Sequence, residues 1–215
     1  PPTQVPCVID ADGLRVVLDH PELVRGSRWV VLTPNRPEYE RMLGSLLPTQ
    51  PTPSPQGEAR TEDDSSTVGS STVGSSTVGS GGSMDEQSAA IDQLARLCNA
   101  LDGPVVVRKG PNDWICNGAA FVENCEKGSP KRSGGQGDVL AGTVATLLSW
   151  ARAAELAGAL PDGSPSAPLL ATYTGCLLTR RFSREAFARH RRAMTAPDLV
   201  EVIGHVFEEF SPSSS

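Results

Sequence analysis

Apolar residues gather in three short runs along the first half of the chain, at residues 5–10, 29–33 and 105–109. Each run has the length of a strand and stops at acidic, proline or glycine residues that are typical of turns. The pattern predicts three buried parallel strands.

Helical spacing fills the gaps between these runs. Residues 12–18 and 38–47 fit short helices, and residues 86–101 place their apolar side chains on one face. Strand and helix therefore alternate, which predicts a βαβ arrangement. After the third run, an Asn-Gly pair favours a hairpin over residues 115–122.

The second half of the chain has helical spacing throughout, with helices predicted over residues 138–158, 169–182 and 197–210. Thr195 and Asp198 match a capping box near the start of the last helix. The whole pattern predicts a three-layer α/β fold, in which a mainly parallel sheet carries helices on both faces.

The exception is residues 48–84, which are rich in Pro, Ser, Thr and Gly and repeat Ser-Ser-Thr-Val-Gly in tandem. Such a segment has too few apolar side chains to offset the entropy of ordering it. We expect a disordered surface insertion within a single domain that spans residues 1–215.

Charge and composition narrow the class of partner. The formal net charge of −6 argues against nucleic acid. No apolar run approaches the roughly 18–20 residues of a membrane span, so no membrane partner is expected. The five scattered cysteines favour a reducing compartment, so a cytoplasmic location is expected. The cysteines and histidines lack zinc spacing, so no metal-ligating residues are predicted. A small-molecule partner fits best, and a homo-oligomer stays open.

Candidate chemistry is concentrated in residues 128–138, Gly-Ser-Pro-Lys-Arg-Ser-Gly-Gly-Gln-Gly-Asp, before a predicted helix. Glycine lets the backbone approach a ligand, and helix N-termini carry partial positive charge. With Lys131 and Arg132 they predict an anion hole for a phosphoryl group, beside which Asp138 can accept a proton. The alternative is a loop in which Asp138 only caps the helix. The segment matches neither a P-loop nor a dinucleotide fingerprint.

Five ordered blocks resemble the ATP-dependent NAD(P)H-hydrate dehydratases, a branch of the ribokinase-like superfamily. The blocks lie at residues 10–14, 32–38, 108–118, 134–138 and 177–195, and they include Asp-Ala-Asp-Gly-Leu and Gly-Gly-Gln-Gly-Asp. The resemblance implies ATP-dependent dehydration of hydrated NADH and NADPH (NADHX and NADPHX), with ATP as co-substrate, Mg²⁺ as its companion ion, and ADP and phosphate as products.

The resemblance also implies the site residues, with Asp138 as the catalytic base. The implied hydrate-binding residues are Asn35, Arg36, Pro37, Glu38, Tyr39, Glu40, Arg41 and Asp138. The implied ATP-contacting residues are Lys109, Gly110, Pro111, Asn112, Asp113, Gly128, Ser129, Pro130, Lys131, Arg132, Ser133, Gly134, Gly135, Gln136 and Gly137.

Two alternatives stay open: a ribokinase-like kinase for a small alcohol such as a vitamin precursor, and an inactive nucleotide-binding fragment. The family places part of the sheet before the first block, so we expect an N-terminally truncated domain, with a mitochondrial location open for a full-length form. A basic run near the C-terminus is explained by an exposed helix and loop. Its members are Arg180, Arg181, Arg184, Arg189, His190, Arg191 and Arg192.

Overall fold

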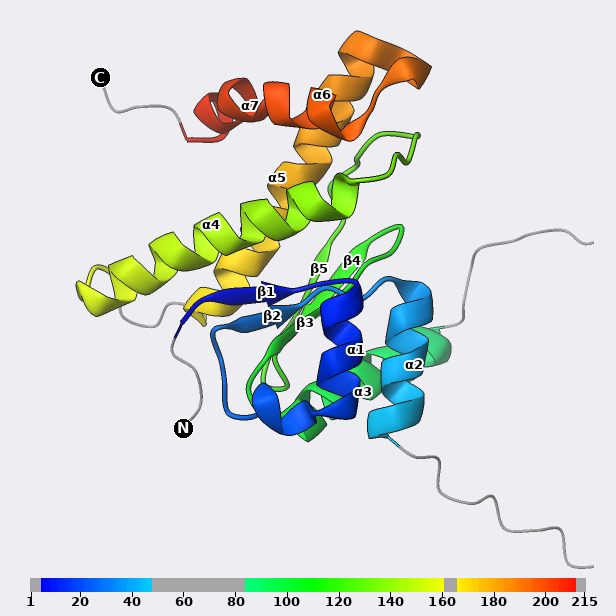
Figure 1. The fold of residues 1–215 in the computed structure, drawn as a ribbon, viewed down its shortest axis with the longest axis vertical. Helices are drawn as coiled ribbons and strands as arrows, with labels where there is room; N and C mark the ends of the chain where they lie inside the picture. The colour runs from blue at the N-terminus through cyan, green and yellow to red at the C-terminus, as the bar shows by residue number, and fades with distance from the viewer. Residues whose placement is uncertain (1–4, 48–83, 161–165, 212–215) are drawn as a thin grey trace, which may run out of the picture.

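The computed structural model describes residues 5–47, 84–160 and 166–211. Five strands in these ranges form one sheet in sequential order (Figure 1). They are β1 (Cys7–Ile9), β2 (Val30–Leu32), β3 (Val105–Arg108), β4 (Asp113–Cys116) and β5 (Phe121–Asn124).

The sheet is mixed. β1, β2 and β3 pair in parallel, whereas β3, β4 and β5 pair antiparallel through the predicted hairpin. The α/β class and the three parallel strands are confirmed. The prediction that the first strand is buried is wrong, because β1 lies at the edge of the sheet: Cys7 is exposed and the next two residues are half-buried.

The helices are close to those predicted from the sequence, and two short 3₁₀ turns accompany them. The elements are α1 (Asp12–Asp19), η1 (Pro21–Leu23), α2 (Arg36–Leu46), α3 (Met84–Leu101), α4 (Gln136–Leu156), α5 (Ala167–His190), η2 (Arg191–Ala193), α6 (Ala196–Glu201) and α7 (Ile203–Phe210). α5 extends eight residues beyond the predicted end at Phe182.

The sheet separates two apolar layers, as Figure 1 shows. α1, α2 and α3 cover one face, where Leu32 and Val106 join the core. α4 and α5 cover the other face, where Val31, Val105 and Val107 join a second core. Because successive strand side chains point to opposite faces, an uninterrupted apolar strand supplies both layers. The prediction of helices on both faces is confirmed.

A third apolar cluster joins α5 to α6 and α7. The single helix predicted over residues 197–210 is wrong, since the chain breaks at Val202 between α6 and α7. Val202 is buried there with Leu199 and Val206, so the break lets both short helices pack against α5.

Most of the predicted insertion, residues 48–83, lies outside the described residues, and only its last position falls in the structure, as the first residue of α3. The insertion and the single domain over residues 1–215 therefore stay predictions. Within the described ranges, no helix combines the length and the apolar character that crossing a bilayer requires.

Candidate active site

The ends of β1 and β3 bring the first two site residues together. Asp10 follows β1 and Lys109 follows β3, and Lys109 Nζ donates to Asp10 Oδ1 at 2.8 Å. Both side chains are mostly buried, at 22% exposure for Lys109 and 18% for Asp10. The backbone N–H of Lys109 donates to the Pro34 carbonyl at 3.0 Å, which brings the start of the predicted hydrate-binding stretch to the same edge.

The glycine-rich loop meets this pair at the start of α4. Gly135 is the N-cap residue and has φ of 85°, a left-handed conformation that favours glycine. A Cβ atom at Gly137 would lie 3.3 Å from Asp10 Oδ2 and 3.9 Å from Lys109 Nζ. Asp138 stands in the first turn of α4 and is exposed. An acid, an ammonium group and a helix N-terminus therefore converge at the carboxyl ends of the parallel strands.

The predicted hydrate-binding stretch forms the first turns of α2. Asn35 Oδ1 accepts from the Glu38 N–H at 3.0 Å, and Glu38 Oε2 accepts from the Asn35 N–H at 2.7 Å, a complete capping box. Arg36 Nε pairs with Glu40 at 2.8 Å on the exposed side, where Pro37 and Arg41 also lie.

Tyr39 is the inward member of this stretch. It is 4% exposed, and the Arg108 guanidinium lies 5.4 Å from the centroid of its ring. Burial raises the pKa of Tyr39 to about 12. The stretch thus lies at the candidate site, while its polar groups at Asn35 and Glu38 are engaged in starting the helix.

The first predicted ATP stretch is a tight turn whose side chains face the protein. Asn112 Nδ2 donates to Glu123 at 2.7 Å. Asp113 is buried and accepts from the Gly110 N–H at 3.3 Å and from Asn124 Nδ2 at 3.2 Å. The side chains of Asn112 and Asp113 are therefore engaged within the protein, and the Lys109 ammonium, paired with Asp10, is the charged group that this turn offers a nucleotide.

The second predicted ATP stretch is anchored mainly to the C-terminal helices. Ser129 N–H donates to Ser183 Oγ at 3.1 Å. Lys131 Nζ donates to the carbonyls of Arg192 and Met194 at 2.7 and 2.6 Å. These two hydrogen bonds tie Lys131 to η2 and the residue that follows it, and the contribution of Lys131 to an anion hole stays a prediction.

The remaining residues of this loop are less constrained. Arg132 and Gly134 are exposed, and Gln136 Nε2 donates to the Lys131 carbonyl at 3.4 Å. Gly128, Pro130 and Ser133 complete the loop. Ser133 Oγ is buried without a hydrogen-bond partner among the described residues, which is uncommon for a buried polar group.

Two residues absent from the predicted site belong to its framework. Asp10 has a sequence signal, because it directly follows a strand at the carboxyl edge of a parallel sheet. Arg180, by contrast, has no signal in the local sequence pattern. The explanation of Arg180 as part of an exposed basic run is wrong: its side chain is 17% exposed and pairs with Asp113. Hydrogen bonding to Asp113 raises the pKa of Arg180.

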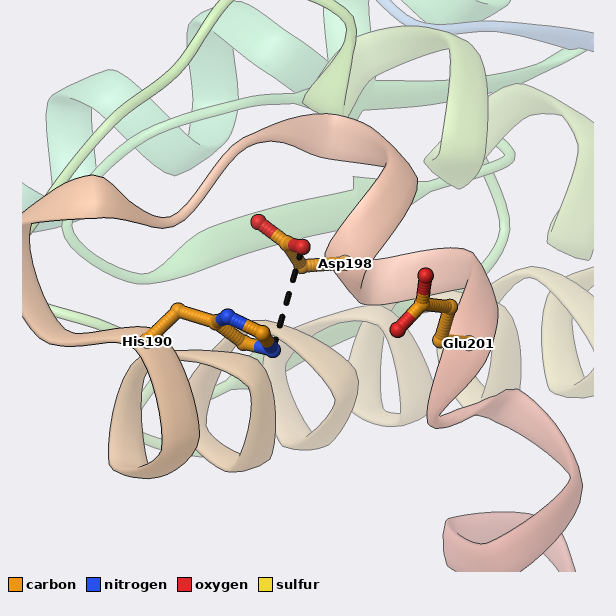
Figure 2. A group of neighbouring side chains, drawn as sticks. All are labelled: His190, Asp198 and Glu201. Carbon is orange, nitrogen blue, oxygen red and sulfur yellow. Dashed lines mark ion pairs between the residues drawn. The ribbon is translucent and has the colours of Figure 1, made fainter.

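A separate polar cluster lies at the corner between α5 and α6. Figure 2 shows His190, Asp198 and Glu201, with His190 Nε2 3.8 Å from Asp198 Oδ1. Asp198 Oδ2 already accepts from the Thr195 N–H, and this bond lowers the pKa of Asp198. Because His190 and Glu201 are exposed and Asp198 caps α6, surface ion pairing explains the cluster.

Solved structures define the class of fold. A ribokinase-like superfamily protein from Enterococcus faecalis aligns with a TM-score of 0.57 and 17% identity, covering 94% of this chain and 52% of that one. A hypothetical protein from Streptococcus mutans aligns with a TM-score of 0.58 and 16% identity, covering 98% and 56%. The fold is therefore ribokinase-like.

The family is narrower than the fold. The family model described as NAD(P)H-hydrate dehydratase matches residues 2–205, and the chain belongs to this family. Proteins named ATP-dependent (S)-NAD(P)H-hydrate dehydratase are 34% identical in Bos taurus and 32% identical in Homo sapiens and Arabidopsis thaliana. These alignments cover 94–99% of this chain but only 48–50% of the relatives, so the chain spans about half their length.

Proposed function

We propose that this chain carries the catalytic and ATP-binding part of an enzyme that dehydrates NADHX and NADPHX at the expense of ATP. The observation that carries the proposal is the position of Asp138, an exposed acid in the first turn of α4, directly after Gly137, which approaches the Asp10–Lys109 pair. The names of the related proteins support the choice of substrate.

The first chemical step assigns the base role to Asp138. Its carboxylate takes the proton of the hydrate hydroxyl, and the oxygen attacks the γ-phosphorus of ATP. A new O–P bond forms while the bond from the γ-phosphorus to the bridging oxygen of ADP breaks. The C–O bond to phosphate of the phosphorylated hydrate then breaks, the neighbouring carbon loses a proton to water, and the C=C bond of the reduced nicotinamide forms.

Positioning accounts for most of the expected catalysis, because phosphoryl transfer needs in-line geometry and stabilised charge. The N–H groups at the start of α4 and the Lys109 ammonium supply positive potential. Ser133 Oγ, buried without a partner among the described residues, is placed within the ATP stretch and can donate to a phosphate oxygen.

The carboxylate of Asp10 fits the Mg²⁺ that would accompany ATP, since this ion prefers oxygen ligands and is mostly held by phosphates and water, while Asp138 keeps the role of base. When bound, Mg²⁺ neutralises charge on the phosphates. The residues of the chain position the nucleotide and move the proton.

The test follows the return of reduced-nicotinamide absorbance after mixing the chain with NADHX, Mg²⁺ and ATP. Asp138→Asn is compared with Asp19→Asn, which makes the same change at an exposed acid, the last residue of α1. We expect ATP-dependent recovery that Asp138→Asn abolishes and Asp19→Asn preserves. A folded chain that binds ATP but restores no absorbance would contradict the proposal and leave the kinase or inactive-fragment alternative.

A further inference from the structure

One guanidinium group, from a helix far away in the sequence, contacts the first predicted ATP stretch and the Glu126 carbonyl, two residues before the second stretch begins. Arg180 lies in α5, and its Nε and Nη2 donate to Oδ2 and Oδ1 of Asp113 at 2.6 and 2.7 Å. This bidentate pair is largely buried, with Asp113 8% and Arg180 17% exposed. Such a pair is charge-assisted and fixes the relative orientation of its partners.

The other donors of Arg180 hold backbone carbonyls. Nη2 donates to the Gly110 carbonyl at 2.9 Å, and Nη1 donates to the carbonyls of Pro111 at 2.7 Å and Glu126 at 3.2 Å. With the two bonds to Asp113, these contacts occupy all five N–H donors of an arginine. Arg180 therefore has no donor left for a ligand, and any effect it has on binding acts through the loops.

The same turn of α5 supports the second loop. Ser183 Oγ donates to the Arg180 carbonyl at 2.8 Å and accepts from the Ser129 N–H at 3.1 Å. A Cβ atom at Gly128 would lie 2.9 Å from Ser183 Oγ and 3.6 Å from Arg180 Cγ. The glycine-rich loop thus begins in contact with α5, at the helical turn that carries Arg180 and Ser183.

We infer that Arg180 is a positioning residue for the nucleotide: it sets the spacing between the turn at residues 110–113 and the loop that begins at Gly128. The inference rests on the proposed function. Lysine cannot replace it, because an ammonium group has three donors and no planar fork. By contrast, the hydrate-binding stretch at α2 makes no contact with Arg180 among its hydrogen bonds in the described residues.

The test compares Arg180→Lys with Arg184→Lys, which makes the same change one turn along α5. Arg184 is half exposed and contacts only the Glu126 carboxylate and the Lys127 carbonyl. We expect Arg180→Lys to raise the dissociation constant of Mg-ATP, measured by calorimetry, about 10- to 100-fold, the range seen when a group that orients ligands is lost. Arg184→Lys should change it by less than about 3-fold, as exposed pairs contribute little.

A second readout separates positioning from general weakening. In Arg180→Lys without ATP, hydrogen exchange should speed up at residues 110–113 and 126–131 and stay unchanged in β2 and α2. Where turnover is measurable, the KM for ATP should rise while the KM for the hydrate stays within about 2-fold. If Arg180→Lys does not fold, Asp113→Asn weakens the same bidentate Arg180–Asp113 pair through its acidic partner and tests the same role.

The outcomes are distinct. An unchanged ATP affinity in a folded Arg180→Lys chain would overturn the inference. A loss of hydrate affinity as large as the loss of ATP affinity, together with a lower melting temperature, would also overturn it. Wild-type chain that binds ATP without dehydrating NADHX would sink the proposed function, while a selective ATP defect in Arg180→Lys would still support the role of Arg180. Wild-type chain that binds no ATP would overturn both.

Discussion

The two predicted ligand-binding regions differ in what holds them in place. The hydrate-binding stretch is fixed by contacts between near neighbours, such as the capping box between Asn35 and Glu38, three residues apart. The predicted ATP-binding loops are fixed from α5, through hydrogen bonds that Arg180 donates and one that Ser183 accepts, over separations of 54 to 70 residues. One region is therefore expected to tolerate changes elsewhere in the chain, and the other to depend on the whole fold.

The largest effect is expected for Asp138, the proposed catalytic base, because it lies in the predicted ATP region without holding that region in place. Asp138→Asn removes the proposed base, and we expect dehydration to fall by about 10²- to 10⁴-fold, the usual contribution of general-base catalysis. The melting temperature and the dissociation constant of Mg-ATP should stay close to those of the wild type. A large loss of stability would instead assign Asp138 to the cap of α4.

A change at Asp113, unlike one at Asp138, should lower the stability of the fold. Asp113→Ala leaves the Arg180 guanidinium largely buried and unpaired, and breaking such a pair costs about 3–5 kcal/mol of unfolding free energy. Urea denaturation measures this loss. Asn112→Ala removes a neighbouring side chain whose hydrogen bond to Glu123 is exposed, and it should cost no more than about 1 kcal/mol. An equal loss of unfolding free energy in the two variants would contradict a stabilising role of the Arg180–Asp113 pair.

Asn35 tests the locally fixed region. Asn35→Ala should lower the unfolding free energy by about 1 kcal/mol through loss of the N-cap, whereas Asn35→Ser keeps a capping oxygen and should be nearly neutral. Thr195→Ala, in the matching capping box of α6, gives the reference for a cap. If Asn35 also binds the hydrate, Asn35→Ser will raise the KM for NADHX without changing stability; an unchanged KM would limit Asn35 to its helix.

The smallest expected effect concerns Tyr39 and appears only in alkali. Its folded-state pKa of about 12 lies above the ordinary value of 10.0, so the folded chain keeps a proton that the unfolded chain loses. The resulting contribution to stability is complete below about pH 10 and is lost as pH rises toward 12. Urea titrations should show the unfolding free energy falling less steeply with pH in Tyr39→Phe than in the wild type, and equal slopes would place the phenol in solvent.

Local pattern determined much of this protein. Apolar runs gave β2 and β3, the Asn-Gly pair gave the hairpin, and the capping signal at Thr195 lies where α6 begins. The glycine-rich segment and Asp138 were found at the start of α4, because backbone freedom and helix ends are written into nearby residues.

Tertiary structure decided what each charged group does. Only folding brings the Lys131 ammonium to the carbonyls of Arg192 and Met194, in and directly after η2, which lie 61 and 63 residues away along the chain. Arg180 belongs to a run of basic residues with the composition of an exposed surface, yet it is the member whose donors are all used inside the protein. A sequence pattern reports neighbours within a few residues, whereas burial and hydrogen-bond partners depend on segments that meet only when the sheet and α5 pack together.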